Sequence, residues 1–227
     1  MTGQMQRYAI YYAPPAGDLA SAAGAWLGWD PARGRAVAQP AVAGADLAAA
    51  TEAPRRYGFH GTLKPPFRLA EGTDRAALVA AIEAFARTRA PVGAGPLSLA
   101  RIGRFLALVP DAPLEPLADL AAATVVAFEP FRAALGDAEI ARRRPESLTP
   151  RQRDLLARFG YPYVMEEFRF HLTLSGPLGT EAGPIEAAAR RHFAPWIGLS
   201  FAVRELCLFG EDAHERFHLL SRHPLAS

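Results

Sequence analysis

The sequence has little cysteine and no long apolar run. Its one cysteine, Cys207, can form neither an internal disulfide nor a metal site built from several thiolates. No stretch approaches the roughly 18 consecutive apolar residues that a membrane-spanning helix needs. Near the N-terminus, no apolar segment has the length of a signal-peptide core. We therefore expect a cytoplasmic protein that does not associate with a membrane.

Charge is modest, and lysine is almost missing. The formal net charge is +2, which suits an anionic substrate but is too small for a protein that coats nucleic acid. Of the 25 basic residues, only Lys64 is a lysine. This ammonium group lies four residues after His60, which makes it a candidate for a site at that histidine. The alternative is that its position is an accident of composition.

Apolar periodicity and turn residues predict an α+β protein. Half of the residues are hydrophobic, and 227 residues suffice for one large domain or two small lobes. A capping box at 149–152 and glycines after two of the helices mark helix ends. We expect strands at 7–13, 57–69, 168–175, 200–209 and 216–221, and a hairpin at 97–109. We expect helices at 18–26, 74–86, 117–135 with a kink at Pro130, 150–159 and 186–193.

Two segments half a chain apart repeat one another. Residues 57–66 read Tyr-Gly-Phe-His-Gly-Thr-Leu-Lys-Pro-Pro, and residues 168–177 read Phe-Arg-Phe-His-Leu-Thr-Leu-Ser-Gly-Pro. Both have an aromatic residue three positions before the histidine, phenylalanine directly before it and threonine two positions after it. A single His-x-Thr sequence means little, because one histidine in a strand is more often structural. Two of them in matching strand contexts indicate a duplicated site.

Strand geometry gives each repeat a polar face and an apolar face. Side chains alternate between the faces of a strand with a period of two. The residues expected on the polar faces are His60, Thr62 and Lys64 in the first repeat and His171, Thr173 and Ser175 in the second. We expect a bilobal, pseudo-twofold duplication in which two antiparallel sheets face a central cleft, with helices outside. The two polar faces would then converge.

The converging groups suit reaction at a phosphodiester. One neutral imidazole can take a proton from the attacking group, and one charged imidazole can give a proton to the leaving oxygen. Threonine hydroxyls can donate to the non-bridging oxygens, and Lys64 can add a point charge. We predict that His60, Thr62, His171 and Thr173 are catalytic. We predict that Lys64 and Ser175 bind the substrate.

The remaining histidines lack this context. His192 lies near the end of a helix, either on the surface or as a partner of the helix dipole. His214 and His218 would need the nearby Glu211, Asp212 and Glu215 to hold a metal, and we expect no metal site. The run Arg142 to Arg144 is either a solvated basic patch or, as the alternative, a phosphate-recognition element at the mouth of the cleft.

The two aromatic-His-x-Thr-Leu sequences resemble those of the two-histidine (2H) phosphoesterase superfamily. This resemblance implies a bilobal α+β protein that acts without metal on cyclic phosphodiesters or 2′-5′ linkages of nucleotides and RNA. His60, Thr62, His171 and Thr173 match motif positions, whereas Lys64 lies outside the superfamily motif. More narrowly, residues 57–67 and 160–163 resemble a branch linked with phosphonate metabolism. That branch implies a sugar cyclic phosphate, formed after carbon–phosphorus bond cleavage, as one candidate substrate.

These observations together predict a metal-independent phosphodiesterase that needs no cofactor. Residues 1–227 are expected to form one bilobal domain with one motif per lobe, in strands near 57–69 and 168–178. We expect a monomer that acts on a small phosphorylated substrate, a nucleotide or an RNA end. Two alternatives stay open: a non-catalytic protein that binds a phosphorylated ligand or RNA end, and RNA 2′-5′ ligase-like activity. The residues do not say which imidazole is the base.

Overall fold

The computed structural model describes residues 5–180 and 182–226. Its strands are β1 (Arg7–Tyr12), β2 (Trp29–Asp30), β3 (Arg35–Ala36), β4 (Gly61–Phe67), β5 (Val92–Ile102), β6 (Phe105–Pro110), β7 (Leu172–Thr173), β8 (Ser200–Val203), β9 (Glu205–Glu211) and β10 (Phe217–Pro224). Its α-helices are α1 (Asp18–Leu27), α2 (Leu47–Ala50), α3 (Glu52–Arg55), α4 (Arg75–Ala86), α5 (Glu115–Ala127), α6 (Asp137–Arg142), α7 (Pro150–Phe159) and α8 (Ala182–His192). Three 3₁₀ turns are η1 (Glu129–Phe131), η2 (Pro145–Ser147) and η3 (Met165–Glu167).

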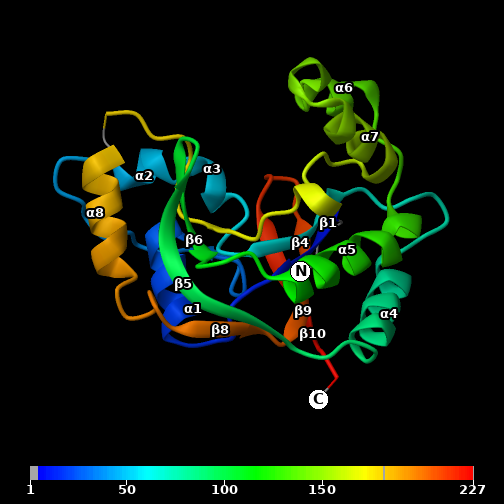
Figure 1. The fold of residues 1–227 in the computed structure, drawn as a ribbon, viewed down its shortest axis with the longest axis horizontal. Helices are drawn as coiled ribbons and strands as arrows, with labels where there is room; N and C mark the ends of the chain where they lie inside the picture. Colours follow the sequence, from blue (N-terminus) through cyan, green and yellow to red (C-terminus); the bar gives the residue numbers. More distant parts are fainter. Residues whose placement is uncertain (1–4, 181, 227) are drawn as a thin grey trace.

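Eight strands form one curled antiparallel sheet (Figure 1), in the order β10-β9-β1-β4-β7-β6-β5-β8. The strands that carry the two His-x-Thr sequences, β4 and β7, are neighbours at its centre. The predicted α+β class is confirmed. The predicted pair of separate sheets is not, because the pairing of β4 with β7 joins the two halves into one continuous sheet. The small hairpin β2–β3 lies outside it.

β1 is buried on both faces from Tyr8 to Tyr12. Tyr8, Ile10 and Tyr12 point into the main core, which the sheet shares with α1, α4, α5 and α8. Ala9 and Tyr11 point to the opposite face, into a second buried cluster with residues of β9 and β10. A strand buried on both faces reads as a continuous apolar run, and its burial fixes the register of its neighbours.

Local signals determine several helix ends. Gly28 closes α1 in the left-handed conformation, and Thr149 and Gln152 form the predicted capping box of α7. The predicted helix 117–135 instead ends at Ala127 and continues as η1, because Pro130 cannot donate a backbone hydrogen bond to the helix. Within the described residues, no helix combines the length and apolar character needed to cross a bilayer.

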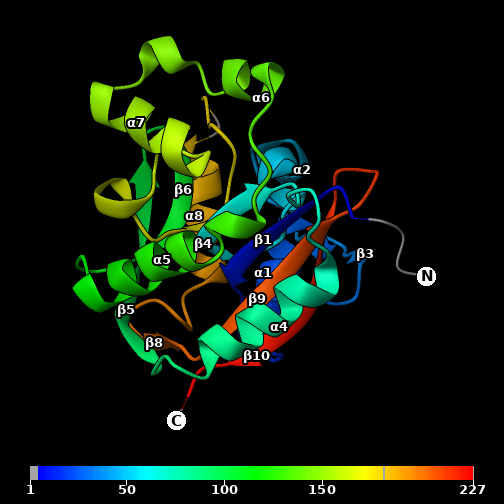
Figure 2. The same cartoon turned by 90° about the vertical axis from the view of Figure 1, so that its right-hand side faces the viewer.

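Between η1 and β7 the chain forms a helical segment, residues 137–167, that we call the helical cap. It contains α6, η2, α7 and η3, and it projects beyond one side of the sheet (Figures 1 and 2). A small buried cluster of Leu155, Phe159 and Val164 with Val125 of α5 fastens it to the rest of the molecule. The cap is therefore a packed element that can hold side chains in place.

Candidate active site

The pairing of β4 with β7 brings the two His-x-Thr sequences together. Gly61 pairs with Leu172, and each of these residues directly follows the histidine of its own repeat. Continuing this antiparallel register by one residue puts His60 opposite Thr173 and Thr62 opposite His171. These side chains share one face, because Gly61 and Leu172 between them belong to the other. Leu172 is fully buried in the main core.

Gly61 allows this close approach of the two strands. A β-carbon at Gly61 would lie 2.3 Å from Cζ of Phe170 and 3.2 Å from Cδ2 of Leu172. The Phe170 ring is itself fixed, since it packs against Tyr12 and Phe201. Only glycine fits between the strands at this point without movement of the ring.

Each histidine ring is oriented by a backbone carbonyl two residues before it. Nδ1 of His60 lies 2.9 Å from the carbonyl oxygen of Gly58, and Nδ1 of His171 lies 2.8 Å from that of Arg169. A carbonyl can only accept, so Nδ1 carries the proton and donates in both rings. Nε2 of each ring is then the atom that can exchange a proton with a substrate.

Aromatic rings surround His60. The ring of Tyr11 stacks on it with centroids 3.9 Å apart and an interplanar angle of 26°, and Tyr57 lies 5.9 Å away. Burial lowers the pKa of His60 to about 4; the hydrogen bond to Gly58 opposes this shift, and the charge of nearby His171 adds to it. The His60 imidazole is therefore neutral near pH 7.

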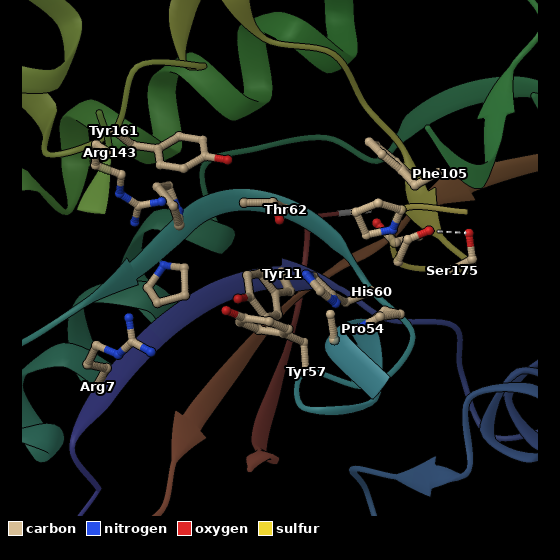
Figure 3. Close-up of a pocket in the computed structure, with 16 residues that line it drawn as sticks. Arg7, Tyr11, Pro54, Tyr57, His60, Thr62, Phe105, Arg143, Tyr161 and Ser175 are labelled. Atoms are coloured by element: carbon tan, nitrogen blue, oxygen red, sulfur yellow. Dashed lines mark hydrogen bonds between the residues drawn. The ribbon is translucent and has the colours of Figure 1, made fainter. Parts of the chain in front are cut away.

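A cavity of about 310 Å³ opens over this face (Figure 3). His60, Thr62 and Thr173 line it. His171 is not among the lining residues. The centroid of its ring lies 5.7 Å from that of Phe105, which does line the cavity. The other lining residues are Arg7, Tyr11, Ala53, Pro54, Tyr57, Pro65, Pro66, Arg143, Tyr161, Ser175, Gly176 and Pro177.

The prediction that Lys64 shares the polar face is wrong. Tyr11 pairs with Thr62 while Ile10 pairs with Lys64, so one step along β1 spans two residues of β4. This bulge breaks the alternation and turns Lys64 to the side of Ile10, away from the cavity. There Lys64 is 1% exposed, and its ammonium donates to the carbonyl of Val125 and to Oε2 of Glu129, each at 3.0 Å.

Ser175 does line the cavity, but its hydroxyl already has protein partners. Its Oγ donates to the carbonyl of Gly176 at 2.8 Å and accepts from the amide of Leu106 at 3.0 Å (Figure 3). The single hydroxyl proton is therefore already donated within the protein. These two hydrogen bonds give Ser175 a structural role, in which it joins β6 to the second repeat.

Three of the four histidines outside the repeats have a hydrogen-bond partner for the imidazole ring. His192 bonds to the carbonyl of Ala22 at 2.9 Å, and His218 pairs with Asp212 at 2.8 Å. His223 is buried and bonds to Ser221. In the part of the chain that the structure describes, no group of three or more His, Cys, Asp or Glu residues is arranged to hold a metal ion.

A protein-family model matches a large part of the chain. A family described as a protein of unknown function, DUF1045, matches residues 62–218, which is more than half of the chain. The chain belongs to this family. The match includes Thr62, His171 and Thr173 of the repeats, together with the whole helical cap.

Two curated relatives resemble the DUF1045 chain closely in sequence. It is 38% identical over 217 residues to a protein of Janthinobacterium sp. (strain Marseille) named ribose 1,5-bisphosphate phosphokinase PhnN, with 92% of this chain and 48% of the relative covered. It is 39% identical over 216 residues to a protein of the same name from Laribacter hongkongensis (strain HLHK9), with 94% and 50% covered. The chain thus spans about half the length of the curated relatives it matches.

Solved structures are more distant from the DUF1045 chain. A crystal structure of a phosphoesterase shares 15% identity at a TM-score of 0.46, with 99% of this chain and 100% of that chain covered. The structure of E. coli LigT complexed with NADP+ shares 16% identity at the same TM-score and coverage. A likeness of this degree assigns no activity.

The pocket of this DUF1045 protein also contains residues that the motif did not indicate. Arg7 and Tyr11 come from β1, Phe105 from β6, and Arg143 and Tyr161 from the helical cap. Their position depends on how distant segments fold over the sheet, so spacing along the chain could not reveal it. Two sequence features had pointed to this region. One is the run Arg142 to Arg144, whose middle member faces the pocket while its outer two are exposed; the other is the segment 160–163, which contains Tyr161.

Proposed function

We propose that this protein is a phosphodiesterase that hydrolyses a cyclic or 2′-linked phosphodiester by two-histidine acid–base catalysis without a metal. The observation that carries the proposal is the register of β4 and β7. It supports a site in which two imidazoles and two threonine hydroxyls share one face beside a cavity. Both imidazoles have Nδ1 held by a carbonyl, which leaves Nε2 for chemistry.

In the proposed reaction, water attacks phosphorus and the bond to one ester oxygen breaks. Nε2 of one neutral imidazole takes the proton of the attacking water, while the other imidazole, protonated, gives its Nε2 proton to the departing oxygen. Thr62 and Thr173 donate hydrogen bonds to the non-bridging oxygens, where negative charge is held. The product is a phosphomonoester and a free hydroxyl, and the two histidines have exchanged protonation states.

The relatives' name suggests a substrate class. Those proteins are named for a kinase of ribose 1,5-bisphosphate. Consider a cyclic phosphate that bridges O1 and O2 of ribose 5-phosphate. Cleavage of its phosphorus–O2 bond would yield ribose 1,5-bisphosphate. We therefore propose a phosphorylated sugar carrying a cyclic phosphodiester as the preferred substrate, in line with the resemblance to the phosphonate-linked branch.

The same name raises a phosphokinase as a second candidate function. A P-loop kinase places lysine between glycine and serine or threonine, so that the ammonium reaches the nucleotide phosphates. Lys64, the chain's single lysine, lies between Leu63 and Pro65 and is buried against Glu129. The sequence around Lys64 does not match a P-loop, and this favours the phosphodiesterase. The kinase activity in the relatives' name suits the half of those proteins that this chain does not cover.

Incubation with a panel of cyclic phosphates tests the proposal. The panel contains nucleoside 2′,3′-cyclic phosphates, a 2′-5′-linked dinucleotide and ribose 1,2-cyclic phosphate with and without a 5-phosphate. We expect a phosphomonoester product in the presence of excess chelator, because no metal takes part. Turnover that chelation abolishes and one added metal restores would contradict the mechanism. If a panel member binds and no member is converted to product, the result would favour a non-catalytic binding protein.

A further inference from the structure

The helical cap brings one cationic side chain to the pocket. Arg143 directly follows α6 and is half-buried, whereas its neighbours Arg142 and Arg144 are exposed. Its guanidinium lies over the ring of Tyr161, 4.9 Å from the centroid, and both residues line the cavity. The electrons of a ring face attract a cation that lies over it, which favours this position of the guanidinium. Arg143 is thus a positioned cation.

The charge of Arg143 is not committed to a protein carboxylate. Among residues 5–180 and 182–226, no acidic side chain forms an ion pair with it. Arg7, the other arginine of the pocket, donates two hydrogen bonds to Glu211, at 2.5 and 2.6 Å. Of these two cations, Arg143 is therefore the one that keeps its donors for a ligand.

Arg143 lies apart from the proposed reacting groups. In Figure 3, Arg143 and Tyr161 lie on one side of Thr62, and the proposed catalytic His60 lies on the other side, toward Phe105 and Ser175. An anion beside Arg143 is therefore a different group from the phosphate held between the two repeats. A cavity of about 310 Å³ has room for a small sugar with two phosphate groups.

We propose that Arg143 binds a second phosphate group of the substrate, a phosphomonoester separate from the phosphodiester that is cleaved. This rests on the proposed phosphodiesterase function and deepens it by naming a recognition residue. The planar guanidinium matches two oxygens of a phosphate, and the Tyr161 hydroxyl can add a further donor. Arg143 lies over one face of the Tyr161 ring, so that face carries a cation and is not free to stack on a nucleobase.

A matched pair of substrates tests this site. The kcat/KM of ribose 1,2-cyclic phosphate is compared with that of its 5-phosphate for wild type, Arg143→Gln, Arg143→Lys and Arg142→Gln. Wild type should prefer the 5-phosphate at least a hundredfold, and Arg143→Gln should reduce that preference tenfold or more. Arg143→Lys should keep part of the preference for the 5-phosphate, because the positive charge remains but the planar guanidinium, which can donate two parallel hydrogen bonds, is lost. Arg142→Gln, at the exposed neighbour, should keep the full preference.

A binding measurement separates this inference from the proposed function. Ribose 5-phosphate is titrated calorimetrically into wild type and Arg143→Gln, and thermal melts confirm that both are folded. If neither cyclic phosphate is turned over but Arg143→Gln weakens this binding tenfold, the phosphodiesterase proposal fails and the phosphate site stands. If turnover occurs with the same preference in Arg143→Gln as in wild type, the phosphate site is wrong and the proposed function stands. Absence of both turnover and binding overturns both.

Discussion

Lys64 and Glu129 form an ion pair whose members differ in exposure. The Lys64 side chain is 1% exposed and that of Glu129 is 24% exposed. Burial lowers the pKa of Lys64, while the carboxylate of Glu129 acts against that shift. Glu129 also accepts a hydrogen bond from Arg132 at 2.7 Å, so it keeps a partner if Lys64 is lost. Among the residues that the structure describes, no other acidic side chain forms an ion pair with the Lys64 ammonium.

This asymmetry predicts different costs for the two neutralising substitutions. Glu129→Gln should lower the free energy of unfolding by about 3 kcal/mol or more, since it leaves a buried charge without its counter-ion. Lys64→Met should cost about 1–2 kcal/mol, mainly through the unpaired carbonyl of Val125. Urea unfolding of the three proteins measures both values. A larger loss for Lys64→Met than for Glu129→Gln would contradict the pairing.

His60 predicts a defined dependence of stability on pH. Its pKa is about 4 in the folded protein, below the ordinary value of 6.5, so the unfolded chain binds more protons between these two values. Stability therefore falls as pH drops from 6.5 to 4, by up to about 3 kcal/mol. The difference in unfolding free energy between wild type and His60→Asn should change over this window and level off above pH 6.5. A constant difference from pH 4 to 8 would show that His60 is not buried as a neutral ring.

At the scale of strands, the contact between β4 and β7 depends on Gly61, which has no side chain. A β-carbon at Gly61 would lie 2.5 Å from Cε2 of Phe170, within the paired repeats. We expect Gly61→Ala to destabilise the protein by about 1–3 kcal/mol and to reduce turnover, because either the ring or the strand must shift.

Two further variants make this test specific. Gly93→Ala, also in a strand, is the matched control, since nothing lies within 4 Å of the β-carbon it would add. Adding Phe170→Leu to Gly61→Ala should recover part of the lost turnover by making room for the methyl group. Unchanged stability and turnover in Gly61→Ala alone would mean that the strands do not approach in this way.

The same strands show how far the sequence could predict this site. The positions of His60 and Thr62 on one face followed from alternation, and the two repeats could be recognised by their matching neighbours. Lys64 does not follow this alternation, because a bulge opposite Ile10 inserts one residue into β4. A bulge depends on the pairing partner, so period-two reasoning along a single strand cannot detect it.

Across the whole molecule, the duplication of the motif predicted the fold class but not how its halves join. Equivalent positions of the two repeats pair directly, which makes one continuous sheet instead of two facing sheets. The helical cap adds Arg143 and Tyr161 to the pocket through packing of Phe159 and Val164 against α5. Contacts of this kind join segments far apart in the chain, and they leave no local pattern in the sequence.

In the proposed mechanism, His60 and His171 act as one proton-transfer unit. Single-turnover kinetics on His60→Ala, His171→Ala and the double variant test it most directly, with the best cyclic phosphate of the panel as substrate. Thermal melts check the fold, and exposed His214→Ala is the control.

Each single variant should lose about 10²–10⁴ in rate, the usual contribution of one acid or base. The double variant should be scarcely slower than either, since removing one partner already stops the shared step. A loss below tenfold in either single variant, or losses that multiply in the double variant, would contradict the two-histidine mechanism.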